Sequence, residues 1–257
     1  GMPLVPMADW PKDTPKSALF TDHSADDPEL TNRVRQVVDA GGTVFLTASA
    51  LALNDDNEEL KELAGYQKDG WSQVNSWMGT HYKIGDETIE VADGVPFRFD
   101  LRPETATVLA EVGGIAHART ELTPVVTRQD HPSGGAVVVL NVYGACERDY
   151  RMDENLNVPQ ILPAMGLPTE VVNVIQREVA KATGGAILGP AKVAYYPFEN
   201  GDVVIENFND EAVLLVPEGS PLPKNGSDEF DVTDFVEMRG QSMIRIQGRS
   251  VALITAS

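Results

Sequence analysis

A strand–helix–strand pattern near the start of the chain most constrains its fold. A short apolar run at 18–20 precedes a helix start at Asp27, which is followed by proline. Apolar residues then recur at helical spacing up to Val38, and Gly41 begins the glycine pair that ends the helix. Residues 43–47 are strand formers. Two strands joined by one helix form a βαβ unit with parallel strands, so the sequence predicts an α/β domain.

The middle of the chain continues as short elements with turn residues between them. We expect a second helix near 58–64, looser strand-like sequence over 71–100, and strands at 106–112, 124–128 and 136–143. Residues 131–135 between the last two strands have the composition of a hairpin turn. Because the apolar run at 137–140 lacks alternation, it predicts a central strand covered on both faces.

The last third of the chain changes character. A helix opens at Pro168-Thr169 and ends at Gly184-Gly185. Six short strands then follow, at 192–196, 203–208, 212–216, 230–238, 242–247 and 251–255. Short strands without helices indicate an antiparallel β-sandwich. We therefore divide the chain into an extended lead-in at 1–16, an α/β domain at 17–188 and a small sandwich at 189–257.

Charge and cysteine content limit the function. The 257 residues carry a formal net charge of −19, and a chain this acidic repels nucleic acid and anionic membranes. Neutral ligands such as sugars remain compatible with it. The single cysteine, Cys146, allows no intrachain disulfide and no multi-cysteine zinc site. The longest apolar segment is too short to span a membrane.

Several segments resemble parts of a known family of glycoside hydrolases. The segment Val34–Leu53, VRQVVDAGGTVFLTASALAL, and the later pieces ATVLAEVGG, TPVVTRQD and GGAVVVLNVYG resemble an amidotransferase-like α/β domain. That domain follows the catalytic barrel in one type of microbial β-galactosidase, where it helps the subunits associate. The pieces VVIENFNDEAVLLV and SMIRIQGRSVALI resemble the small β-sandwich that ends many glycoside hydrolases. The resemblance implies a flavodoxin-like or class I amidotransferase-like parallel sheet, followed by a sandwich.

The chain carries no convincing catalytic group. A class I amidotransferase needs a nucleophilic cysteine followed in the chain by a histidine, whereas all four histidines precede Cys146. Ser49 follows a predicted strand, but alanines flank it in place of the glycines of a nucleophile elbow, so it is interpreted as a small residue near a turn. No Gly-x-Gly-x-x-Gly links a strand to a helix. We therefore expect no catalytic residues and no cofactor in this chain.

Acidic residues follow the first two predicted strands. Asp22, His23 and Asp26 lie in the first loop, and Asp55 lies in the next loop of the same sheet edge. Ligands bind α/β domains at this edge, and carboxylates are ligands for divalent cations. The same acids also serve as helix caps. A cation site between the two loops and simple capping remain alternative interpretations.

Three large aromatic residues gather in the strand-like middle segment. Trp71, Trp77 and Tyr82 lie in a stretch that also contains several polar residues. Sugars stack on flat aromatic faces, but large aromatics also fill cores and subunit interfaces. These residues are therefore candidates for a carbohydrate platform, a protein core or an interface.

Together these features predict a non-catalytic accessory region of a carbohydrate-active, glycoside hydrolase-like protein. Its expected partners are other copies of itself or an upstream catalytic domain, joined through an apolar patch on the α/β domain, with carbohydrate as a further possibility. One alternative is a carbohydrate-binding module. The other is a hydrolase whose site lies on the loops at 21–27 and 47–56.

Overall fold

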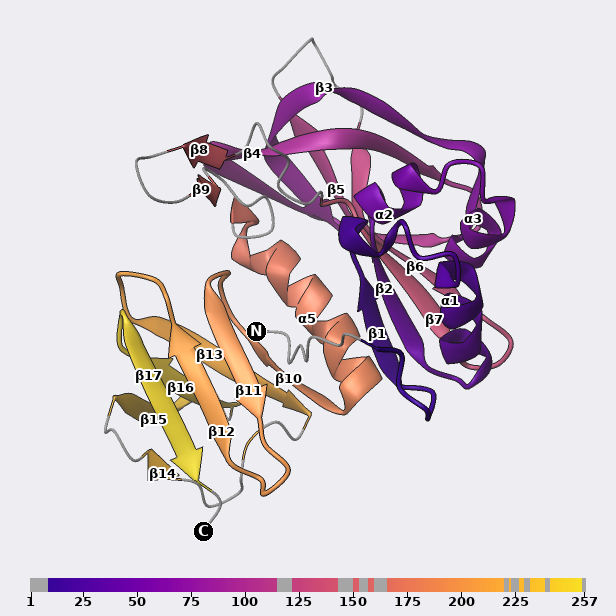
Figure 1. The fold of residues 1–257 in the computed structure, drawn as a ribbon. Coiled ribbons are helices and arrows are strands. Elements are labelled where there is room, and N and C mark those ends of the chain that lie inside the picture. Colours follow the sequence, from indigo (N-terminus) through magenta and orange to yellow (C-terminus); the bar gives the residue numbers. More distant parts are fainter. Residues whose placement is uncertain are drawn as a thin grey trace. The chain divides into compact units, whose positions relative to one another are not determined.

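The structure is a computed structural model that describes residues 9–114, 122–142, 150–152, 157–159, 166–219, 222, 227–228, 232–238 and 241–255. The chain forms two compact units, one of Pro11–Leu167 and one built around Pro168–Ser257 (Figure 1). The division therefore falls about twenty residues before the boundary near 188 that we expected. Helix α5 (Thr169–Thr183) packs on strands of the sandwich, which explains its place in the second unit.

A seven-stranded sheet forms the framework of the first unit, with strand order β1-β2-β7-β6-β5-β3-β4. Its strands are β1 (Ser17–Phe20), β2 (Thr43–Thr47), β3 (Tyr66–Ile84), β4 (Glu87–Pro103), β5 (Thr107–Gly114), β6 (Thr123–Asp130) and β7 (Ala136–Leu140). Only β1, β2 and β7 are parallel, and the other pairings are antiparallel. The sheet is therefore mixed, which corrects the expected parallel sheet. Short turns join β3 to β4 and β6 to β7, and a short turn can connect only antiparallel neighbours.

The predicted βαβ unit is confirmed. Strands β1 and β2 pair in parallel with Ser17 opposite Thr43, and α1 (Leu30–Asp39) connects them. The helix buries the apolar face that the sequence indicated, including Val34, which is fully buried. Gly41 adopts φ 80°, a left-handed conformation that glycine tolerates where the chain turns back toward β2.

Helices cover the parallel part of the sheet. Helix α2 (Ala48–Leu53) packs on β2, and α3 (Glu58–Ala64) packs on α1, β3, β6 and β7. All five residues of β2 and all five of β7 are buried, so both strands are covered on each face, as predicted for 137–140. The 3-10 helix η1 (Asp22–Ser24) follows β1 and packs against α2.

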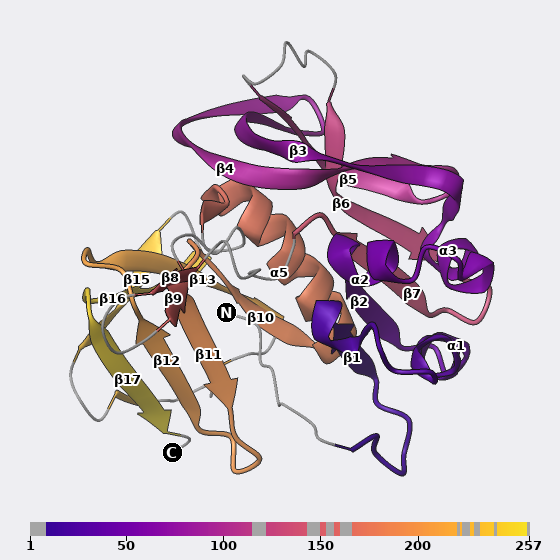
Figure 2. The same cartoon turned by 45° about the horizontal axis from the view of Figure 1, so that its top comes forward.

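Strands β3 and β4 form a long, bent hairpin that makes up the antiparallel end of the sheet (Figure 2). Register shifts interrupt their pairing at several points, which allows such long strands to bend. At Gly79 a side chain would meet Val112 and the ring of Phe97, so only glycine lets β3, β4 and β5 approach this closely. A short two-stranded ribbon, β8 (Tyr150–Met152) and β9 (Asn157–Pro159), completes the described part of this unit.

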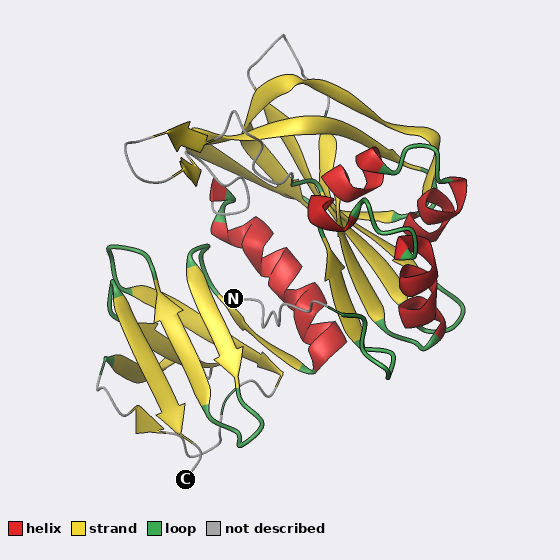
Figure 3. Ribbon diagram, in the orientation of Figure 1, coloured by secondary structure: helices red, strands yellow, loops and turns green. Residues whose placement is uncertain are grey.

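The second unit is an antiparallel sandwich, as predicted. One sheet has the order β10-β13-β16-β15 and the other β11-β12-β17-β14. Figure 3 shows this part of the chain as yellow strands packed in two layers. The strands are β10 (Gly185–Leu188), β11 (Val193–Pro197), β12 (Val203–Asn207), β13 (Val213–Gly219), β14 (Ser227–Asp228), β15 (Thr233–Met238), β16 (Gln241–Ile246) and β17 (Ser250–Thr255). Ile187, Ile205, Leu215, Ile244 and Ile254 lie at the centre of the core between the sheets.

Helix α5 packs on β10 and β13 of the first sandwich sheet. The predicted apolar positions Val171, Ile175 and Val179 are buried, and Gly184 ends the helix with φ 89°. No helix in the described part of the chain is long and apolar enough to cross a membrane.

Candidate functional site

The structure brings the two acidic loops together at the edge where the parallel strands end. The side-chain amide of Asn54, just beyond α2, lies 3.4 Å from the carbonyl oxygen of Ala25 in the loop after η1. The same amide donates to the carbonyl oxygen of Ala50 at 2.9 Å, so Asn54 links the end of α2 to the loop after η1. This edge of the sheet is therefore the candidate functional site of the first unit.

The predicted cation site is not formed. Across the described ranges, no group of three or more His, Cys, Asp or Glu residues could hold a metal ion, and this search included Asp22, His23, Asp26 and Asp55. Asp55 instead lies 3.3 Å from the ammonium of Lys61. The neighbouring Asp27 accepts the backbone N–H of Glu29 at 3.0 Å and pairs with Arg33. These contacts give Asp27 a capping and pairing role and Asp55 a pairing role.

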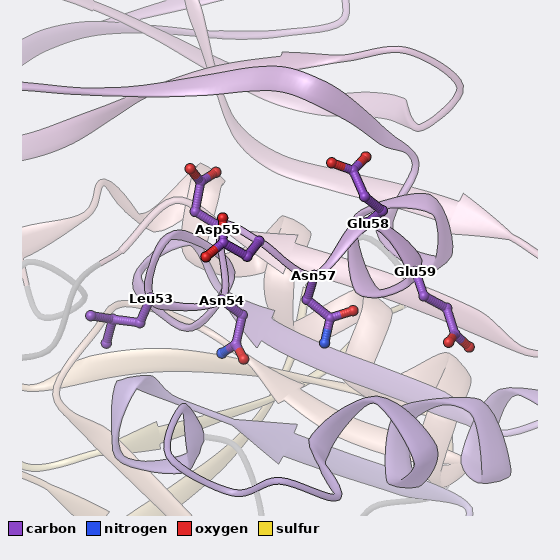
Figure 4. A pocket seen from close by; sticks show the side chains of 7 residues that line it. Leu53, Asn54, Asp55, Asn57, Glu58 and Glu59 are labelled. Carbon is purple, nitrogen blue, oxygen red and sulfur yellow. The ribbon is translucent and has the colours of Figure 1, made fainter.

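A shallow depression of about 600 Å³ follows α2 at this edge and is lined by residues 53–59 (Figure 4). Figure 4 shows the carboxylates of Asp55 and Glu58 directed to the side opposite the amide of Asn57. Asn57 caps α3 by accepting the N–H of Leu60 at 3.0 Å and donates to Thr31 at 2.7 Å. The polar groups of Asn57 therefore stabilise the start of α3. The carboxylates that line the depression do not point toward one common position.

Ser49 has the environment of a structural residue. It is 7% exposed in the first turn of α2, and its hydroxyl lies 3.0 Å from that of Thr47. Thr47 caps the helix by accepting the N–H of Ala50. Within the described residues, no histidine hydrogen-bonds to Ser49, and His131 instead contacts the carbonyl of Leu63 at 2.9 Å. The loops at 21–27 and 47–56 are thus adjacent, but the described contacts assemble no nucleophile and base there. Cys146 lies outside the described residues.

Two of the three aromatic candidates are core residues. Trp77 is 2% exposed and Tyr82 is fully buried. Both rings pack on Phe97, with centroid distances of 5.3 Å for Trp77 and 6.4 Å for Tyr82. Burial raises the pKa of the Tyr82 hydroxyl above its ordinary value. Trp77 and Tyr82 therefore form no carbohydrate platform, which corrects that alternative for them. The side chain of Trp71 lies outside the described set.

The exposed aromatics of the sandwich were missed. Tyr196 is 42% exposed and Phe198 is 54% exposed, at the end of β11 and in the turn after it. The signal was present in the alternating sequence of 193–198. Since Val193 and Tyr195 belong to the core, a period of two places Tyr196 and Phe198 on the outer face.

The similarity of this chain to known proteins lies among solved structures. No protein-family profile matches the chain, and no curated protein matches it. Among solved structures, it is similar to Gan42B, a GH42 beta-galactosidase from G. stearothermophilus, and to a catalytic mutant of that enzyme. Each comparison gives a TM-score of 0.40 and 13% identity, and covers 92% of this chain and 30% of the other. A beta-galactosidase from the psychrophilic Marinomonas ef1 gives a TM-score of 0.37 at 9% identity, covering 94% and 29% of the two chains. The chain thus spans less than a third of the length of these enzymes.

Proposed function

We propose that this chain is a non-catalytic accessory region of a glycoside hydrolase-like protein, and that it holds subunits together by self-association. The order of an α/β unit with a mixed sheet before a β-sandwich supports this proposal. So does the position of Cys146 after every histidine in the sequence, because a class I amidotransferase needs a histidine that follows its nucleophilic cysteine.

The observation that carries the proposal is an apolar row on the outer face of the β10-β13-β16-β15 sheet, which belongs to the sandwich and not to the α/β unit where we expected the apolar patch. Val216 pairs with Leu188, and Val236 pairs with Met243. The pairing of Leu215 with Ile244, both core residues, places Val216 beside Met243 and turns all four apolar residues of the row outward.

Helix α5 packs on β10 and β13, where the row begins. Leu188 is 6% exposed there, whereas Met243 and Val236 at the other end are only half-buried. Leu214, on the same face, is 41% exposed. Four apolar positions in line, with a partly exposed end, form a surface suited to burial against another protein.

The negative net charge of the protein opposes self-association. Two copies with a net charge of −19 repel each other, so a stable contact must bury apolar surface to offset the repulsion. Salt screens that repulsion, because the Debye length falls to about 3 Å at 1 M ionic strength. Self-association through the apolar row should therefore strengthen as salt is added.

Sedimentation velocity over a wide range of protein concentration and salt tests the proposal. We expect a concentration-dependent oligomer that Met243→Glu weakens at least tenfold. Val251→Glu is the matched control, because Val251 is an outward residue, 42% exposed, on the opposite sheet. A chain that stays monomeric at every concentration and salt would contradict the proposal, as would equal effects of the two substitutions.

A further inference from the structure

The outer face of the β11-β12-β17 sheet, opposite to the apolar row, carries a different chemistry. Tyr196 and Phe198 are two positions apart, so their Cα atoms lie about 7 Å from each other along the strand. The N–H of Phe198 donates to the carbonyl of Asp202 at 2.9 Å, which continues the β11–β12 pairing to the position of Phe198. Both rings therefore project from one side of a rigid ladder.

Aliphatic residues extend this surface across the sheet. Tyr196 pairs with Val204, and Val204 pairs with Leu253, so the three side chains form one cross-strand row. Val204 and Leu253 are half-buried, which leaves part of the row open to solvent. We call Tyr196, Phe198, Val204 and Leu253 the aromatic face.

Carboxylates flank the aromatic face along β12. Asp202 and Glu206 alternate with the core residues Val203 and Ile205, so they point to the same side as Val204. Four residues of strand place them about 13 Å apart, on either side of the ring of Tyr196. The amide of Asn200 donates to the carboxylate of Asp202 at 2.6 Å and fixes its orientation.

We propose that the aromatic face binds a neutral carbohydrate. One face of a pyranose ring presents mainly C–H groups, which stack against an aromatic ring and leave water. The hydroxyl groups at the sugar's edge are donors, and carboxylates are strong acceptors for them. Two rings and two flanking carboxylates match a sugar that lies along β11.

The charge of the protein favours a neutral ligand over an anionic one. The face itself carries Asp202 and Glu206, and the whole chain carries −19, so a uronic acid polymer or a phosphate would be repelled. A sugar without charge meets no such barrier. This inference goes beyond self-association, and it concerns the opposite face of the sandwich.

Native gel electrophoresis in gels containing a soluble neutral polysaccharide tests the proposal, with galactan, xylan, glucomannan and mixed-linkage β-glucan in separate gels. We expect at least one polymer to slow the wild-type chain. Phe198→Ala and Tyr196→Ala should each weaken the retardation about tenfold, which corresponds to about 1.4 kcal/mol. Tyr196→Phe, which keeps the ring, should retain most of it.

Phe235→Ala is the matched control. Phe235 is 55% exposed, nearly the same as Phe198, but it lies on β15 of the other sheet. A wild-type chain that none of the four gels retards would overturn the proposal. Equal losses for Phe235→Ala and Phe198→Ala would do the same. If Phe198→Ala disrupts self-association and no polymer retards the chain, the aromatic face is a protein interface and the proposal is wrong.

Discussion

The side-chain amide of Asn141 donates a hydrogen bond to the carbonyl oxygen of Phe99 at 3.1 Å. The same nitrogen donates to the carbonyl of Pro124 at 2.8 Å, so one residue beyond β7 links β4 to β6. Asn141 is 1% exposed, and within the described residues its side-chain oxygen accepts no hydrogen bond. Because two carbonyls require a donor at this point, the amide cannot turn over to satisfy its oxygen.

We therefore expect Asn141→Ala to lower the free energy of unfolding by about 2 kcal/mol, because two buried carbonyl groups lose their donor. Asn141→Asp should cost more, since a carboxylate would face the same two carbonyls. Urea denaturation measures both. Asn200→Ala, at an exposed turn, is the control and should change stability by less than about 0.5 kcal/mol. An equal effect of the two alanine substitutions would show that Asn141 is not a structural link.

Trp77→Ala should destabilise the protein strongly. Trp77 is 2% exposed and stacks on Phe97, and truncating a buried tryptophan removes about 3 to 5 kcal/mol. Phe198→Ala, at 54% exposure, should leave the melting temperature nearly unchanged. Thermal unfolding followed by circular dichroism compares the two variants directly. A similar melting temperature for Trp77→Ala and wild type would place Trp77 at the surface.

Buried tyrosines should resist ionisation at alkaline pH. Burial raises the pKa of Tyr66 and of Tyr82 above the ordinary value of 10.0, and for Tyr66 the hydrogen bond with Thr127 lowers it slightly in return. A raised pKa in the folded state means that the stabilisation is complete below pH 10 and is lost as the pH rises beyond it. Tyrosinate absorbance near pH 10 should therefore report fewer ionised groups in the native chain than in urea, out of six tyrosines. Identical titration curves in both states would contradict this burial.

Asp55 should stabilise a buried ammonium group. Lys61 is 2% exposed and lies 3.3 Å from Asp55, whose side chain is 66% exposed. Asp55→Asn should therefore cost about 1 kcal/mol, while Asp56→Asn, in the same depression, should have little effect. Lys61→Met should be neutral or stabilising, because it removes the buried charge and keeps the volume of the side chain. Urea denaturation measures the free energy of unfolding of each variant. A large decrease for Lys61→Met would show that the ammonium group makes stabilising contacts besides the one with Asp55.

The elements with a clear local sequence pattern were predicted correctly. The helical face of α1, the parallel pairing of β1 with β2, the buried run of β7 and helix α5 all follow from the spacing of apolar residues over a few turns. Hairpin chemistry at 131–135 likewise gave the antiparallel β6–β7 pair. Most of the sandwich strands also follow from alternation.

Contacts between segments that lie far apart in the sequence could not be predicted from local spacing. Nothing local indicates that β5 pairs with β3 across the long hairpin, so the mixed sheet could not be predicted. The sequence left core, interface and carbohydrate platform open for Trp77 for a related reason, since Trp77 packs on Phe97 from another strand. Likewise α5 belongs to the second unit because of its packing on β10, which no helical periodicity shows.

The parallel pairing of β2 with β7 has a consequence for synthesis. Thr43 pairs with Ala136, and α2, α3 and β3 to β6 all lie between them in the chain. When β1, α1 and β2 leave the ribosome, the edge of β2 that will pair with β7 is uncovered. It stays uncovered until α2, α3 and β3 to β6 have been translated and β7 follows. Contacts between such distant segments form slowly, and an uncovered strand edge invites pairing between nascent chains. Truncation just before β7 should therefore yield aggregates rather than a smaller folded protein.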